Sequence, residues 1–98
     1  MIDHLVLFSL REDVSREAAD DLVSSLRALR ESVPDVMDLS VGENFSERSG
    51  GYTHGLFVRL RTHDDLQSYM NHPAHLAVVE KLDERTTGRI VVDYEHEG

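Results

Sequence analysis

The chain has 98 residues and a formal net charge of −9, from 19 acidic and 10 basic side chains. Phosphate binding requires a basic surface, so this balance argues against a nucleic-acid partner. The absence of cysteine excludes disulfides, thiolate nucleophiles and Cys-ligated metal sites. A hydrophobic content of 40% is typical of a globular protein, and the length predicts a single domain over residues 1–98.

The N-terminus, Met1-Ile2-Asp3-His4, has no basic region. The apolar run that follows, over residues 5–10, is too short for a signal peptide or a membrane helix. We therefore expect a cytoplasmic protein with no membrane partner.

Residues 2–10 are predicted to form the first strand. Both alternating sets of side chains are largely apolar, so both faces of this strand should be covered. Residues 16–33 have apolar side chains in steps of four and three, which predicts an amphipathic helix. Asp13 or Ser15 can cap its start, and Pro34 ends it.

Two strands follow, over residues 36–42 and 52–61, separated by a polar, glycine-containing loop at residues 43–51. Thr62 and Asp65 resemble a capping box, so a second helix should begin there.

Residues 76–82 continue the helical pattern, residues 83–88 are predicted to form a turn, and residues 89–94 form the last strand. The tail at residues 95–98 is expected to fray, with His63 and His96 both exposed.

This order of elements, βαββαβ, predicts an α+β, ferredoxin-like fold with a four-stranded antiparallel sheet. The helices cover one face of the sheet, and no segment remains to cover the other. An uncovered apolar face usually marks an interface, and a second copy of the same sheet is the simplest cover. We therefore expect a homodimer through the helix-free face, which carries Leu5, Leu7, Phe57, Ile90 and Val92.

The stretch from Tyr69 to His75 places a phenol and two imidazoles around Pro73. Pro73 should stop the incoming helix by His72 and can open a new one. In one straight helix Tyr69 and His75 would lie about 120° apart, whereas a break can turn both toward one point. The structural alternative is a helix–loop–helix corner with surface histidines.

Several motifs occur in a specific order along nearly the whole chain. They are His4-Leu5-Val6-Leu7-Phe8, Val41-Gly42-Glu43-Asn44, Tyr52-Thr53-His54, Tyr69-x-x-His72-Pro73-Ala74-His75 and Asp93-Tyr94. In this set the chain resembles the stress-responsive dimeric α/β-barrel (Dabb) domain family. The resemblance implies a ferredoxin-like homodimer whose two sheets form an α/β barrel.

One plant branch of this family contains a polyketide cyclase that performs an intramolecular aldol condensation without a cofactor. Its catalytic Tyr and His match Tyr69 and His75, and a pocket-lining His matches His4. The resemblance thus implies His75 as base, Tyr69 as donor to an enolate and His4 in support. The expected substrate is a small polyketide-like or aromatic carbonyl compound, and no cofactor is expected.

Strand alternation and the break at Pro73 predict a pocket between sheet and helices. Besides the three catalytic candidates, the expected pocket residues are Val6, Phe8, His54, Leu56, Val58 and His72. His4 and His54 also fit a purely structural role as hydrogen-bonded core residues. We expect no metal site, because neither an H-E-x-x-H motif nor a suitably spaced carboxylate accompanies the histidines.

Two functional classes remain open. One is a cofactor-independent cyclase or lyase of the aldol type. The other is a non-catalytic dimer that binds a small apolar ligand or acts as a stress protein. An oxygen-using enzyme on the same dimeric fold is a third alternative.

Overall fold

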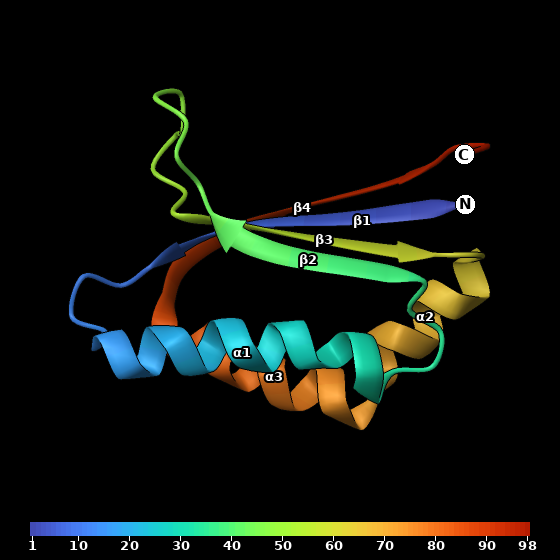
Figure 1. The fold of residues 1–98 in the computed structure, drawn as a ribbon, viewed down its shortest axis with the longest axis horizontal. Helices are drawn as coiled ribbons and strands as arrows, with labels where there is room; N and C mark the ends of the chain where they lie inside the picture. The colour runs from blue at the N-terminus through green and yellow to red at the C-terminus, as the bar shows by residue number, and fades with distance from the viewer.

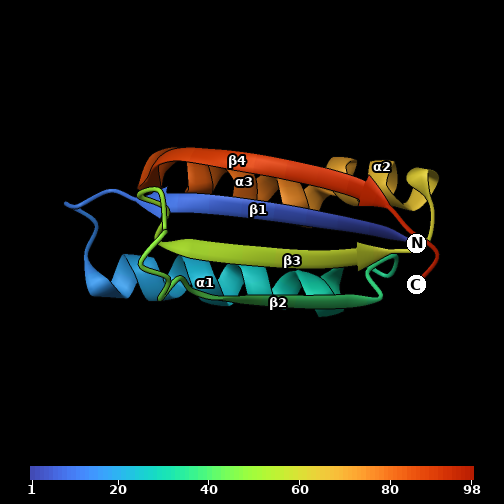
Figure 2. The same cartoon turned by 90° about the horizontal axis from the view of Figure 1, so that it is seen from above.

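The computed structural model describes residues 1–98 as one antiparallel sheet with all helices on one face (Figure 1). The elements in chain order are β1 (Ile2–Leu10), α1 (Arg16–Ser32), β2 (Asp38–Glu43), β3 (His54–Leu60), α2 (His63–Asn71), α3 (Pro73–Arg85) and β4 (Thr86–Glu95). The four strands lie in the order β2-β3-β1-β4, which Figure 2 shows from above the sheet. This is the predicted ferredoxin-like α+β fold, with the second helical segment divided into α2 and α3.

Strand β1 lies at the centre of the sheet and determines which side chains share a face. His4 of β1 pairs with Val58 of β3 on one side and with Asp93 of β4 on the other. Because side chains alternate along a strand, these three residues face the helices. Leu5, between Phe57 and Val92, faces the helix-free side.

Helix α1 packs one apolar stripe against the sheet. Its N-cap is Ser15, whose side chain accepts a hydrogen bond from the Ala18 amide. The stripe is fully buried and consists of Leu22, Leu26, Leu29 and the C-cap residue Val33. Burial of each such leucine contributes about 1.5–3 kcal/mol to folding, so this stripe holds α1 on the sheet.

None of the helices has the length and apolar character that a membrane crossing requires.

The break between α2 and α3 lies at Pro73, as the sequence predicts. His72 caps both helices: its amide donates to the Tyr69 carbonyl, and its Nδ1 accepts from the Ala74 amide at 3.1 Å. Pro73 is the first residue of α3, where its missing amide donor costs nothing. The break therefore places the end of α2 beside the start of α3.

The predicted turn at residues 83–88 is wrong. Helix α3 continues to Arg85 and β4 begins directly at Thr86. The Thr86 hydroxyl and amide both bond to the Leu82 carbonyl, which ends the helix. Arg85 is anchored to α1 through the Ala18 carbonyl and the Asp21 carboxylate. These contacts replace the turn that the local composition indicated.

The helix-free face is apolar and uncovered within the chain. Leu7 on the central strand β1 is 41% exposed, and Ile90 and Val92 on the edge strand β4 are 46% and 48% exposed, so this face leaves several large apolar side chains in contact with water. The loop between β2 and β3 rises on this same side of the sheet (Figure 1). The face therefore has the character of an interface.

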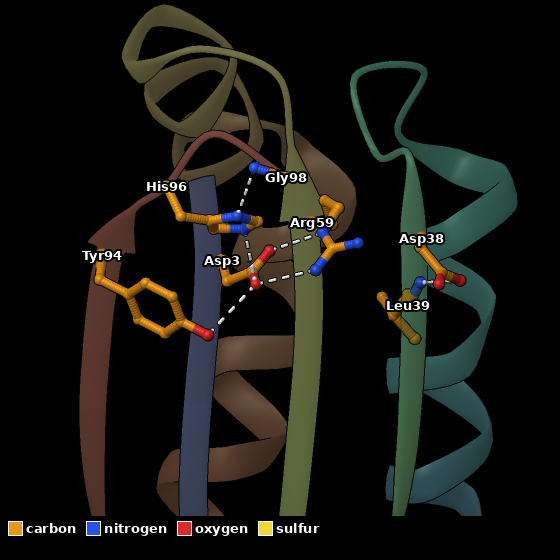
Figure 3. Close-up of polar contacts among 7 residues, drawn as sticks. All are labelled: Asp3, Asp38, Leu39, Arg59, Tyr94, His96 and Gly98. Atoms are coloured by element: carbon orange, nitrogen blue, oxygen red, sulfur yellow. Dashed lines mark hydrogen bonds and ion pairs between the residues drawn. The ribbon is translucent and has the colours of Figure 1, made fainter. Parts of the chain in front are cut away.

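A polar cluster around Asp3 closes one end of the helix-free face (Figure 3). Arg59 donates from Nε and Nη2 to the two Asp3 oxygens at 2.7 and 2.9 Å, and the Tyr94 hydroxyl donates at 3.2 Å. Arg59 is the main cause that holds the pKa of Asp3 well below its usual range. His96 Nε2 lies 2.9 Å from the Asp3 carboxylate without hydrogen-bond alignment, and the His96 amide donates to the Met1 carbonyl. The expectations that the tail frays from residue 95 and that His96 is exposed are therefore wrong.

Candidate active site

A cavity of about 170 Å³ lies between the sheet and the helices. Nine of its twelve lining residues are hydrophobic, and the other three are His4, His75 and Arg89. Such a site suits an apolar molecule that a few polar groups orient.

The structure brings five of the expected pocket residues together around this cavity. His4 and Val6 of β1 and Leu56 of β3 reach it because alternation directs them to the helix-covered face. Tyr69 from the end of α2 and His75 from the start of α3 reach it because the chain breaks at Pro73. The rings of Tyr69 and His75 have their centroids 4.6 Å apart.

The Tyr69 hydroxyl is buried and has no hydrogen-bond partner in the protein. A buried hydroxyl without a partner costs about 1–3 kcal/mol, so such groups are rare in folded proteins. Burial also raises the pKa of Tyr69, which keeps the O–H protonated over the physiological range. Its ring contacts the His4 ring edge-on, with centroids 5.8 Å apart. The site therefore contains a neutral donor with no protein acceptor.

His75 is half-buried in the first turn of α3. Its Nδ1 bonds to the Met70 carbonyl at 3.0 Å. A carbonyl oxygen only accepts, so Nδ1 carries the proton and the lone pair is on Nε2. Burial is the main cause that lowers the pKa of His75, with smaller contributions from His4 and Arg89. The imidazole is therefore neutral near pH 7 and can accept a proton at Nε2.

His4 is held by Asp93, its neighbour across the β1–β4 pair. The ring Nδ1 bonds to the Asp93 carboxylate, and Nε2 has no protein partner. A carboxylate that fixes an imidazole determines which of its nitrogens carries the proton, as in catalytic and metal-binding histidines. His4 itself is buried, whereas Asp93 is 41% exposed.

Four expected pocket residues lie outside the cavity lining. Phe8 and Val58 belong to the packed core. His54 is at the far end of β3, where it stacks on Phe8 with ring centroids 5.1 Å apart and its Nδ1 bonds to Thr53. Burial lowers its pKa. His72 caps the two helices, as described above.

A wider groove of about 810 Å³ runs between α1 and β2 and contains His54. Only four of its eleven lining residues are hydrophobic, and neither Tyr69 nor His75 reaches it. No three His, Asp or Glu side chains in the chain cluster as the ligands of a metal ion would. The smaller cavity is therefore the candidate site.

Sequence reasoning missed two charged residues of this region, Arg89 in the cavity lining and Asp93 beside His4. Their faces depend on the register of β4 against β1, in which Phe8 pairs with Arg89 and His4 with Asp93. A slip by one residue would turn both away from the helices. The alternation of β4 alone does not fix this register, because both of its faces are apolar.

Three curated relatives are similar to the chain. An uncharacterized protein of Streptomyces coelicolor is 35% identical and aligns over 97% of this chain and 99% of its own length. A stress-response A/B barrel domain-containing protein of Arabidopsis thaliana is 30% identical, over 83% of this chain but only 31% of that longer protein. Olivetolic acid cyclase of Cannabis sativa is 22% identical, over 76% of each chain.

Solved structures agree on the fold. A hydroxynitrile lyase from Passiflora edulis superimposes with a TM-score of 0.88 at 16% identity, over 95% of this chain and 90% of the lyase. A dimeric ferredoxin-like protein from Thermobifida fusca gives a TM-score of 0.83 at 22% identity, over 95% and 88%. At these identities the likeness concerns the fold alone.

The family assignment comes from the sequence as a whole. A profile of the stress responsive A/B barrel domain matches residues 2–96. The motifs around His4, Tyr69, His75 and Asp93 lie within that range and meet at the cavity and the adjacent β1–β4 pair. The chain therefore belongs to the stress-responsive A/B barrel domain (Dabb) family.

Proposed function

We propose that this protein is a cofactor-independent acid–base enzyme of the cyclase or lyase type that acts on a small carbonyl compound. One observation carries the proposal: the buried Tyr69 hydroxyl has no protein partner and its ring packs against that of His75, an imidazole with a free Nε2. A folded protein retains an unpaired buried donor at a cost, and a ligand oxygen would offset it. A carbonyl oxygen is such an acceptor.

The reaction step follows from these two groups. His75 Nε2 removes a proton from the carbon next to the substrate carbonyl: the C–H bond breaks, an N–H bond forms, and the electron pair passes into an enolate. Tyr69 donates a hydrogen bond to the enolate oxygen, where the negative charge develops. In a cyclisation the enolate carbon then attacks a second carbonyl carbon of the same substrate: a C–C bond forms, the π bond of that C=O breaks, and the imidazolium gives its proton to the resulting alkoxide. His4 donates from Nδ1 to Asp93, so Nε2 of its neutral ring has a lone pair and can accept a hydrogen bond from a hydroxyl group of the substrate.

The size of the cavity limits the substrate. A cavity of about 150 Å³ accommodates benzene in another protein, and this one is about 170 Å³. The substrate therefore has an apolar body of about one six-membered ring. The names of olivetolic acid cyclase and hydroxynitrile lyase, two proteins similar to this chain, support chemistry of this type.

A non-catalytic binding dimer is the second candidate. The predominance of hydrophobic residues in the lining favours it, because such a cavity would hold an apolar molecule without transforming it. The two candidates differ in whether proton transfer occurs.

We also propose that the active form is a homodimer joined through the helix-free face. The exposure of Leu7, Ile90 and Val92 supports this, as does the similar ferredoxin-like protein of Thermobifida fusca, which is dimeric. A second copy of the same face would remove these side chains from water.

Proton–deuterium exchange tests the catalytic proposal without knowledge of the natural substrate. Acetophenone has a ring of suitable size and exchangeable protons beside its carbonyl, and proton NMR in D₂O follows their loss. We expect His75→Ala to slow the enzyme-catalysed exchange by roughly 10²–10⁴-fold and Tyr69→Phe by roughly 10²–10³-fold. His63→Ala is the matched control, because His63 is exposed and lies outside the cavity lining.

Two outcomes would contradict the catalytic proposal. One is exchange in the wild-type protein no faster than in buffer. The other is equal exchange in the wild type and His75→Ala at unchanged melting temperatures. Binding of acetophenone without exchange would favour the binding dimer.

A further inference from the structure

Arg89 is the one permanently charged side chain among the residues that line the cavity. It lies on β4, opposite Phe8, and so faces the helices beside Val91. Its side chain is 32% exposed, which places the guanidinium at the border between the cavity and solvent. A charged group costs free energy at the edge of an apolar cavity unless a partner compensates it.

The only interaction of the Arg89 guanidinium with the protein is a weak ion pair with Asp83. Nη2 donates to Asp83 Oδ1 at 2.8 Å, and Nε and Nη1 have no acceptor in the protein. Asp83 is 62% exposed, and surface ion pairs of this kind contribute little stability. A guanidinium has five N–H donors in a planar fork that matches a carboxylate. Asp83 thus holds Arg89 beside the cavity and leaves most of its donors free.

The charge of Arg89 also reaches the reactive end of the site. Burial is the main cause of the lowered pKa of His75, and Arg89 contributes to it through its positive charge. Arg89 and His75 both line the cavity, so one small molecule can contact both. Asp93, the acidic group beside His4, is four residues from Arg89 on the same face of β4, roughly 13 Å along the strand. The end of the site beside Asp93 is therefore the less favourable one for an anion.

We propose that the ligand of this cavity is a small carboxylate with an apolar body of about one ring, whose carboxylate pairs with the free donors of Arg89. This inference names the substrate class for the site in the proposed function and rests on that site. In the bound state the ring fills the apolar part of the cavity, and a carbonyl group on it points toward Tyr69 and His75.

Equilibrium binding of two probes tests the inference. Benzoate and benzamide have the same ring and nearly the same shape, but only benzoate carries a negative charge. We expect benzoate to bind at least roughly 10-fold more tightly than benzamide, because hydrogen bonds to charged groups are the stronger ones. Calorimetry gives the affinities. Amide NMR shifts locate the site: Val79 and Leu82 of the cavity should shift, and Phe57 on the helix-free face should not.

Three variants separate charge from shape. Arg89→Gln should weaken benzoate binding by roughly 10- to 100-fold and leave benzamide nearly unchanged. Arg89→Lys keeps the charge without the planar fork and should give an intermediate affinity. Arg48→Gln is the control, because it removes the same charge from the exposed loop between β2 and β3.

The inference would be overturned by equal affinities for benzoate and benzamide, by no binding of benzoate at millimolar concentration, or by equal loss in Arg48→Gln and Arg89→Gln. Displacement of benzoate by inorganic phosphate at equal concentration would also overturn it, since Arg89 would then be a general anion site. None of these measurements requires turnover. Failure here would leave the exchange test of His75 and Tyr69 untouched, and failure of the exchange test would leave the carboxylate site standing.

Discussion

At the scale of single residues, the Tyr69 hydroxyl separates a functional site from an ordinary core. A tyrosine buried for packing alone normally finds a hydrogen-bond partner for its O–H. Tyr69 is completely buried and has none. The aromatic ring packs in the core, whereas the hydroxyl makes no hydrogen bond within the chain.

This difference predicts opposite effects of Tyr69→Phe on stability and activity. Removal of an unsatisfied buried hydroxyl should leave the free energy of unfolding unchanged or raise it by up to about 1–3 kcal/mol, while the exchange rate falls. Urea denaturation measures the first quantity. A loss of stability of about 1 kcal/mol or more would mean that the hydroxyl has a structural partner, and would weaken its assignment as a donor to substrate.

At the scale of the elements, periodicity predicted each strand and α1 because it records which side chains are buried. It failed at residues 83–88, where Asp83 and Gly88 suggested a turn. The actual boundary is set by Arg85, which bonds to Ala18 and Asp21 in a distant part of the sequence. Contacts of this kind arise only in the folded chain, so a local pattern does not contain them.

Some residues of the candidate site are likewise predictable from the sequence pattern, and others are not. The meeting of His4, Tyr69 and His75 follows from strand alternation and from the break at Pro73, which are both visible in the sequence. Arg89 and Asp93 join them only through the pairing of β4 with β1. His54 was predicted to line the pocket but does not. It lies on the same face of the sheet as His4 but at the other end, and side-chain alternation predicts the face of a residue without its distance along the strand.

The junction of α2 and α3 gives a prediction at this scale. The His72 side chain caps α3, so His72→Ala should lower the free energy of unfolding by about 0.5–2 kcal/mol, the usual cost of a lost N-cap. His72→Asn supplies another capping side chain and should preserve stability. Thermal and urea denaturation of both variants check this. Equal losses in the two variants would show that the imidazole acts through another contact.

At the scale of the whole molecule, one sheet face is covered by helices and the other is open. This asymmetry predicts that the protein associates through the open face. Leu7→Asp should dissociate the dimer, because a buried unpaired charge costs several kcal/mol. Leu76→Asp is the matched control, since Leu76 is 52% exposed on α3, on the opposite side of the sheet.

Analytical ultracentrifugation at micromolar concentration measures the outcome. The wild type and Leu76→Asp should sediment as dimers, and Leu7→Asp as a monomer or an unfolded chain. A wild-type protein that sediments as a stable folded monomer would contradict the dimer. So would an intact dimer in Leu7→Asp.

The most direct test of the account is the protonation of His75, followed by nitrogen-15 NMR of its imidazole between about pH 5 and pH 8. We predict a pKa below the ordinary value of 6.5, because burial disfavours the charged ring, and a neutral form with the proton on Nδ1. Below that pKa the lone pair of Nε2 is lost, so the exchange rate should fall as the pH drops through it and stay level above it. A pKa above 6.5, or a neutral form with the proton on Nε2, would contradict His75 as the base.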